Sequence, residues 1–145
     1  VPEIYDGIVE IKSISREAGA RTKIAVYSRD ENVDAVGACI GPKRTRIQAI
    51  VNELNGEKID IITYSDDPAE FIARALAPAK VLSVKVSEGE LKECSVIVPN
   101  DQLSLAIGNR GQNAKLAAKL TGYKIDIKPE MEIADKASEP QPADE

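Results

Sequence analysis

The chain has 145 residues, enough for one ordinary domain or two very small ones. Its hydrophobic fraction of 43% is typical of a globular protein, and it holds no apolar run long enough to span a membrane. Histidine is absent, which removes the commonest metal ligand and the usual general base near neutral pH. We therefore expect no membrane contact, no metal, no cofactor and no enzymatic activity.

The net charge of −5 is concentrated at one end of the chain. Residues 130–145 hold six acids and one lysine, so the preceding 129 residues hold 18 acids and 18 bases. Within that neutral part, basic residues gather at Ile40–Gln48 and Gly108–Lys128. Contact with phosphates depends on the local potential, so the total charge does not exclude a nucleic-acid partner. Residues 130–145 have few large apolar side chains and predict a disordered acidic tail.

The first half of the chain predicts short alternating elements. A short opening helix at 1–7 is followed by two strands, a short helix, a longer helix and a buried strand, at 7–14, 21–28, 33–40, 47–54 and 58–64. The polar segment 15–20 is expected to be a loop between the two strands. In the longer helix, the apolar residues Ile47, Ile50, Val51 and Leu54 follow helical spacing, and Gly56 is placed to end it.

The second half predicts the same order of elements. Asp67 is expected to cap an opening helix, with Pro68 in its first turn and Glu70 completing a capping box. The remaining elements are two strands, a short helix, a longer helix and a last strand, at 80–86, 92–98, 101–108, 111–122 and 123–129. This order predicts an α+β fold in which each three-stranded sheet is covered on one face by helices.

The two halves also share sequence. "IGPKRTRIQAI" at 40–50 matches "IGNRGQNAKLA" at 107–117, and "GEKIDI" at 56–61 matches "GYKIDI" at 122–127. Two matches in the same order at nearly the same offset indicate a duplicated module. We place the first module at 1–64, the second at 65–129 and the tail at 130–145. Because each module is small, packing between them should stabilise both.

A glycine loop that joins two helices, preceded by isoleucine and followed by a strand, resembles the KH module. The helix-first order is similar to the prokaryotic (type II) subtype. KH modules clamp about four nucleotides of single-stranded nucleic acid with a GXXG loop. The segments "VDAVGACIG" and "AIGNRGQNAKLAAKLTGYKIDI", with the rest of residues 1–129, resemble the tandem KH region of the NusA family of bacterial transcription elongation, termination and antitermination factors.

This resemblance implies a cytoplasmic, monomeric module that binds single-stranded nascent RNA during transcription. Contacts with RNA polymerase and other transcription factors would belong to domains missing from this chain, which does not begin with methionine. The runner-up interpretation is a protein–protein interaction scaffold on a KH fold, with weak or lost RNA binding in the first module. Salt-dependent RNA affinity would separate the two.

The candidate RNA-binding residues are those that an RNA backbone lying across a helix N-terminus would contact. Glycines without a Cβ let phosphates approach closely, the helix-opening amides attract anions, and nearby cations and amides add contacts. In the first module the candidates are Ile40, Gly41, Pro42, Lys43, Arg44, Arg46 and Ile47. In the second they are Ile107, Gly108, Asn109, Arg110, Gly111, Gln112, Asn113, Lys115, Lys124 and Ile125.

Simpler interpretations stay open for several of these residues. The bases are expected to lie on an aliphatic floor formed by Ile107 and the strand at Ile125–Ile127, but any single isoleucine there is more often a core residue. Arg44 stands where the second module has Gly111. It would be strained by about 1 kcal/mol or more if that position needs a positive φ, and unstrained if it is already helical. We expect retained RNA binding with an altered loop geometry. Cys39 and Cys94 predict two buried free thiols.

Overall fold

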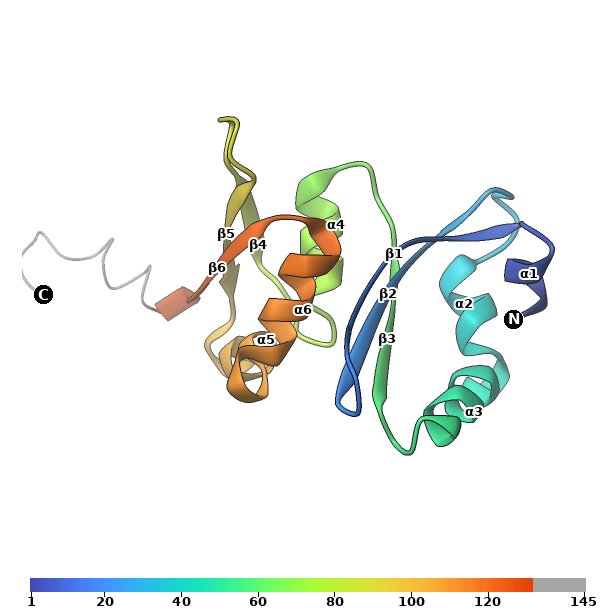
Figure 1. The fold of residues 1–145 in the computed structure, drawn as a ribbon. Helices are drawn as coiled ribbons and strands as arrows, with labels where there is room; N and C mark the ends of the chain where they lie inside the picture. The colour runs from blue at the N-terminus through green and yellow to red at the C-terminus, as the bar shows by residue number, and fades with distance from the viewer. Residues whose placement is uncertain (132–145) are drawn as a thin grey trace, which may run out of the picture.

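A computed structural model of the chain describes residues 1–131 and contains two α+β modules, each with its own three-stranded sheet (Figure 1). We refer to residues 1–64 as the first module and residues 65–129 as the second module. Most of the predicted acidic tail lies outside the described residues. In the described part of the chain, no helix is both long and apolar enough to cross a membrane.

The first module has the predicted order of elements. Its sheet has the strand order β1-β2-β3, with β1 antiparallel and β3 parallel to β2. The elements are α1 (Pro2–Tyr5), β1 (Val9–Glu17), β2 (Arg21–Ser28), α2 (Ala35–Ile40), the 3₁₀ turn η1 (Pro42–Arg44), α3 (Thr45–Glu53) and β3 (Lys58–Thr63).

The second module repeats this order with the sheet β4-β5-β6. Its elements are α4 (Pro68–Ala75), β4 (Ser83–Val86), β5 (Glu93–Val98), η2 (Asn100–Gln102), α5 (Leu103–Ile107), η3 (Asn109–Gly111), α6 (Gln112–Thr121) and β6 (Lys124–Pro129). The Asp67 side chain caps α4 by accepting a hydrogen bond from the Ala69 amide at 3.1 Å, as predicted. The capping-box prediction for Glu70 is wrong, because this carboxylate pairs with Arg74 at 3.1 Å and the Asp67 amide donates to Ser65.

Strand register confirms the duplication. Arg21 pairs with Lys58 between β2 and β3, and Glu93 pairs with Lys124 at the same place between β5 and β6. Lys58 and Lys124 are therefore counterparts, but the residue that pairs with Lys58 is the cation Arg21 and the residue that pairs with Lys124 is the anion Glu93.

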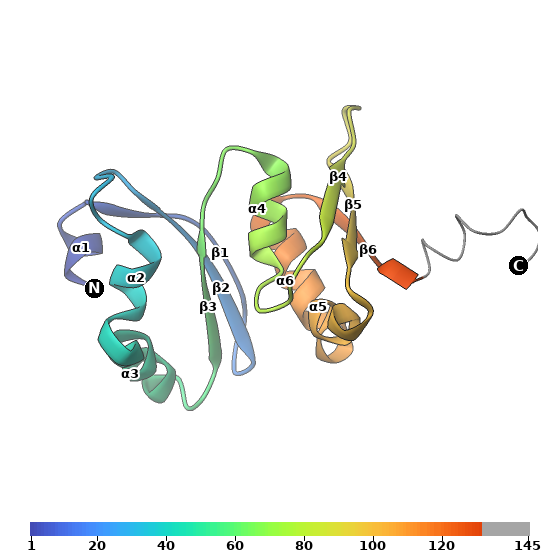
Figure 2. The same ribbon diagram turned by 180° about the vertical axis from the view of Figure 1, so that it is seen from behind.

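The modules pack into four alternating layers, and α4 and α6 lie between the two sheets (Figures 1 and 2). The first sheet is covered by its own helices α2 and α3 on one face and by the second module on the other. One apolar core extends across the junction between the modules. Ala25 and Ile62 of the first sheet pack in it together with Ile72, Leu76 and Leu120 of the second module. Packing between the modules is thus confirmed as part of the core.

Polar contacts also cross the junction. The Ser13 hydroxyl donates to the Leu120 carbonyl at 3.1 Å, and the Ser15 hydroxyl donates to the Leu116 carbonyl at 2.8 Å. Ser15 is only 5% exposed, and β1 continues to Glu17 where a loop was predicted. The loop prediction for 15–17 is wrong because all three residues pair with β2, and Ser15 is buried against the second module while Arg16 and Glu17 stay exposed.

The buried lysine Lys23 ties the modules together. Its side chain is fully buried, and its amine donates to Asp60 Oδ2 at 2.8 Å and to the Ala77 carbonyl at 2.7 Å. Burial lowers the pKa of Lys23, and the Asp60 carboxylate opposes that shift. The ammonium therefore depends on Asp60 to stay charged at the junction.

A second buried charge fixes the turn between β1 and β2. The Glu57 carboxylate accepts hydrogen bonds from Arg16 Nη2 at 2.8 Å, from the Gly19 amide at 3.0 Å and from the Thr22 hydroxyl. Hydrogen bonds from Arg16, then from Thr22 and Gly19, lower the pKa of Glu57 from 4.5 to about 2. The turn is thereby held in place beside the second module.

Candidate nucleic-acid interface

The glycine loop of the second module has a defined backbone shape. Gly108 has φ 82°, and Arg110 and Gly111 follow in the left-handed region with φ 58° and 74°. A Cβ on Gly108 would lie 2.6 Å from the Asn113 backbone nitrogen, whereas one on Gly111 would have no neighbour within 4 Å. Glycine is thus required at Gly108 by both contact and φ, and favoured at Gly111 by φ alone.

The loop of the first module has the same shape. Gly41, Lys43 and Arg44 have φ 78°, 52° and 62°, and a Cβ on Gly41 would lie 2.7 Å from Arg46 Cγ. Arg44 therefore occupies the left-handed conformation at a cost of about 1 kcal/mol. The expectation of an altered loop geometry is wrong, because arginine adopts the conformation that Gly111 adopts in the second module.

Four cations surround the two loops. Lys43 and Arg44 of the first loop and Arg110 and Lys115 of the second are exposed, as are Pro42 and Asn109. Within residues 1–131, none of these four cations has a salt-bridge partner. Their charge is available to an external anion, and the sequence placed them correctly at the loop surface.

Two predicted contact residues are buried instead. Ile47 is 2% exposed and packs inside the first module. Asn113 is also 2% exposed, and its Nδ2 donates to the Leu76 and Ala106 carbonyls at 3.0 Å each. Neither side chain reaches the surface, so both predictions of direct RNA contact are wrong. Asn113 instead fixes the loop, since Leu76 ends α4 and Ala106 lies in α5.

Arg46 does the same work in the first module. It stands five residues after Gly41, as Asn113 stands five residues after Gly108. Its Nη1 donates to Glu3 Oε1 at 2.8 Å and to the Ala38 carbonyl at 2.7 Å. Each module thus joins the helix before its loop to its opening helix through the residue at this position. Arg46 is a positioning residue, with its charge already paired.

Some backbone amides at the start of the helix after each loop, α3 and α6, already donate hydrogen bonds to carbonyls of the loop. The Gly111 amide donates to the Gly108 carbonyl at 3.0 Å, and the Gln112 amide donates to the Asn109 carbonyl. In the first module the Arg44 amide donates to the Gly41 carbonyl at 3.1 Å. These amides were expected to face an anion. Fewer free amides are therefore left to face an anion than the sequence suggested.

The apolar surface beside the second loop comes mainly from α5. Ile107 is 37% exposed and Leu105 is 43% exposed, whereas Ile125 is half-buried and packs against the core. Ile40 of the first module is also half-buried. Sequence reasoning missed Leu105, because a residue two positions before Ile107 on a helix is not expected to share its face. We expect bases to contact this helix more than the last strand.

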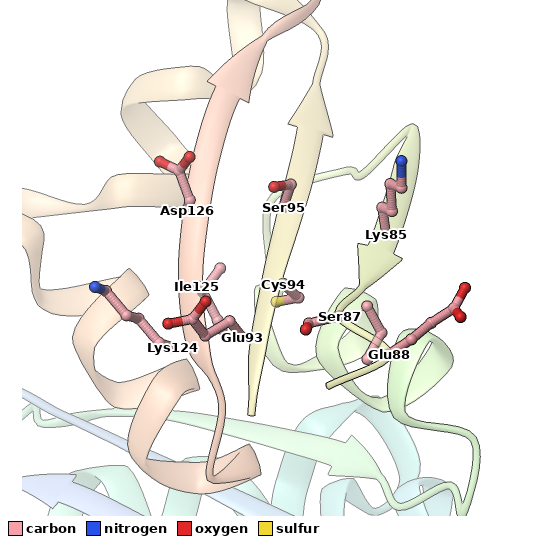
Figure 3. Close-up of a pocket in the computed structure, with 10 residues that line it drawn as sticks. Lys85, Ser87, Glu88, Glu93, Cys94, Ser95, Lys124, Ile125 and Asp126 are labelled. Atoms are coloured by element: carbon pink, nitrogen blue, oxygen red, sulfur yellow. The ribbon is translucent and has the colours of Figure 1, made fainter. Parts of the chain in front are cut away.

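Lys124 lies away from the loop. It follows α6, whose ten residues separate it from Gly111 by about 15 Å. It borders a cavity of about 810 Å³ on the second sheet together with Glu93 and Asp126 (Figure 3). We therefore leave Lys124 out of the proposed interface.

The predicted free thiols are confirmed, since Cys39 and Cys94 are both buried and unpaired. Burial raises the pKa of Cys39 and raises that of Cys94 to about 11. Neither thiol has the lowered pKa that reactive cysteines need. Both cysteines therefore act as small apolar core residues.

The first module also touches the second loop. Gln112 Nε2 donates to Glu17 Oε2 at 2.9 Å, and Arg21 Nη1 donates to Asn113 Oδ1 at 3.1 Å. Glu17 and Arg21 flank the turn that Glu57 holds in place. Sequence reasoning missed these contacts because they depend on how one module docks on the other.

Comparison with known proteins agrees with this architecture. A model of the NusA-like first KH domain matches residues 1–64, and a model of the NusA-like second KH domain matches residues 68–135. A crystal structure of APE1850 has a TM-score of 0.59 and 27% identity, with 87% of this chain and 94% of that chain covered. The similarity thus extends over both modules.

Curated relatives share the same name. The transcription termination/antitermination protein NusA of Bacillus subtilis is 62% identical over all 145 residues, which are 39% of its length. Its namesake in Thermus thermophilus is 57% identical over 93% of this chain and 34% of its own length. The chain therefore spans less than two fifths of these relatives. From the two domain matches and these identities, the chain belongs to the NusA family and contains its tandem KH region.

Proposed function

We propose that this chain binds single-stranded RNA at its two glycine loops, as the RNA-reading part of a bacterial transcription factor. The observation that carries the proposal is the pair of loops with the same left-handed backbone, each with two exposed cations that have no salt-bridge partner among residues 1–131. KH modules use such loops to clamp about four nucleotides each. The module acts by binding and carries out no catalysis.

The names of the relatives extend this proposal to transcription. We propose that the bound strand is nascent RNA, and that binding contributes to pausing, termination and antitermination. Contacts with RNA polymerase and other transcription factors belong to regions beyond this tandem module, which acts as a monomer. The exposed cations favour RNA over the alternative of a protein-only scaffold. They lie beside glycines that leave room for an RNA backbone, and their charge attracts its phosphates.

A salt titration tests the proposed function. We expect a 12-nucleotide single-stranded RNA to bind, with log affinity falling by about 0.7 per phosphate contact for each tenfold rise in salt. The four loop contacts alone, one for each exposed loop cation, give a slope of about −3. Fluorescence anisotropy between 50 and 200 mM salt measures it. Absence of binding at 50 mM salt would support the scaffold instead.

Arg44 allows a sharper test of the first loop. Arg44→Gly keeps the left-handed backbone and removes one cation, whereas Arg44→Glu places a carboxylate beside the phosphates. We expect the glycine variant to lose about threefold in RNA affinity and the glutamate variant at least tenfold. Titration with the same RNA measures both. Equal losses, or no loss in either variant, would refute a charge role for Arg44.

A further inference from the structure

We infer that the junction between the modules forms a third contact with the same RNA strand, in which Lys58 of the first module binds a phosphate beside the second glycine loop. This inference rests on the proposed function and names a site that neither loop provides alone. A strand clamped at both loops has to cross the junction. The residues there decide whether that crossing is attractive or repulsive.

A cavity of about 340 Å³ lies at this junction. Arg21 and Lys58 line it from the first module, and Leu105, Gly108 and Asn109 line it from the second. Its volume falls at the lower end of the range for small-ligand pockets, which suits one nucleotide. The cavity thus joins a cation, an apolar side chain and an amide at one edge of the Gly108 loop.

The side chains that line the cavity have different roles, because some are already paired and others are free to contact a ligand. Arg21 is 14% exposed and already bonds Asn113 Oδ1 at 3.1 Å and Asp60 Oδ2 at 3.4 Å, so it forms part of the wall. Lys58 is exposed and has no salt-bridge partner within residues 1–131. Its ammonium is therefore the group available to a phosphate. Leu105, at 43% exposed, offers an apolar surface to the base.

The other flank of the loop is less favourable to a phosphate. There Glu17 of the first module lines a smaller cavity, of about 240 Å³, together with Arg110 and Lys115. The Glu17 carboxylate accepts a hydrogen bond from Gln112 and so stays beside these two cations. Its charge offsets part of theirs, so this flank attracts phosphates less strongly than the two cations alone would. The junction therefore favours passage of the strand on the Lys58 side.

The duplication shows why Lys58 and not its counterpart has this position. Lys124 begins β6 as Lys58 begins β3, and each follows the longer helix of its module. The second module docks on the first sheet and brings its loop to Lys58. Lys124 has no glycine loop lining its cavity, which it shares instead with the acidic residues Glu93 and Asp126 (Figure 3). Lys124 is thus a matched position without the partner loop.

This comparison supplies the experiment. We expect Lys58→Gln to weaken binding of the 12-nucleotide RNA about fivefold and to reduce the salt slope by about 0.7, the value for one phosphate contact. Lys124→Gln removes the same charge from the counterpart position and is expected to change the affinity less than twofold. Lys58→Arg, which keeps the charge, should retain most of the affinity. Thermal unfolding checks that all three variants are folded.

Footprinting places the contact on the strand. We expect Lys58→Gln to lose protection at nucleotides between the stretch lost in Gly41→Asp and the stretch lost in Gly108→Asp. If wild type binds RNA with a salt slope but Lys58→Gln behaves like Lys124→Gln, the junction contact is overturned and the proposed function stands. If the wild-type chain does not bind RNA at 50 mM salt, both the junction contact and the proposed function are overturned.

Discussion

Replacing Gly108 with aspartate is expected to weaken binding of single-stranded RNA about 30-fold to 100-fold, or about 2 to 2.7 kcal/mol. Two effects combine in this variant. A Cβ at this position would lie 2.6 Å from the Asn113 backbone nitrogen, and φ is 82°, so the loop cannot keep its shape. The added carboxylate would also stand where the RNA backbone is proposed to lie, and like charges repel.

Gly122 provides a matched control. It ends α6 with φ 79°, and a Cβ there would meet no atom within 4 Å. Gly122→Asp therefore adds the same charge with a similar backbone strain at the end of α6 away from the loop. We expect its RNA affinity to stay within about twofold of wild type. Anisotropy titration measures the affinity, and thermal unfolding measures the cost to the fold.

The location of the loss distinguishes the two loops. RNA footprinting with Gly108→Asp and with Gly41→Asp should remove protection from different nucleotides, because each loop is proposed to hold its own stretch. If both variants lose the same nucleotides, a single composite site would replace the two clamps. If Gly108→Asp binds as well as Gly122→Asp, the loop is not the RNA site.

The duplicated fold was predictable from the sequence because its signals are local. Helix caps, glycine stops and alternating strands depend on neighbouring residues, and the repeat supported each assignment twice. The same applies to the exposed cations Lys43 and Arg110, which sit at the tips of tight turns. What the spacing did not reveal was backbone conformation at Arg44, where a bulky residue adopts the left-handed region that glycine favours.

The junction was not predictable because it depends on contacts between residues far apart in the sequence. The composition around Ser15 predicts a loop, yet Ser15 lies in β1 and pairs with β2. Its hydroxyl donates to the carbonyl of Leu116, 101 residues away. Asn113 reads as an exposed amide at a helix start, yet Arg21 and Leu76 enclose it. In both cases, the docking of the second module on the first sheet converts a polar surface into a buried, hydrogen-bonded one.

Replacing Asp60 with asparagine is expected to lower the free energy of unfolding by about 3 kcal/mol, because it leaves the buried Lys23 ammonium without its counter-charge. Lys23 is fully buried, and its amine lies 2.8 Å from Asp60 Oδ2. The Ala77 carbonyl remains as an acceptor but does not neutralise a charge. Chemical denaturation at neutral pH, followed by circular dichroism, measures the change.

Two further variants isolate the cause of that loss. Lys23→Met removes the charge and keeps an unbranched side chain in the core, so we expect it to cost less than Asp60→Asn. Asp126, the counterpart of Asp60, is 62% exposed and pairs with Lys128 at 3.7 Å. Asp126→Asn should therefore change stability by less than about 0.5 kcal/mol. Equal losses in Asp60→Asn and Asp126→Asn would show that the buried lysine does not need its partner.

The pH dependence of the Asp60→Asn variant tests the same point independently. Burial already lowers the pKa of Lys23 from 10.5, and removal of Asp60 should lower it further. Between the native pKa and 10.5 the unfolded chain binds more protons than the folded one, so stability rises with pH. We expect part of the lost stability to return as the pH is raised towards 10. A deficit that stays constant over this range would mean that Asp60 stabilises the junction by packing rather than by charge.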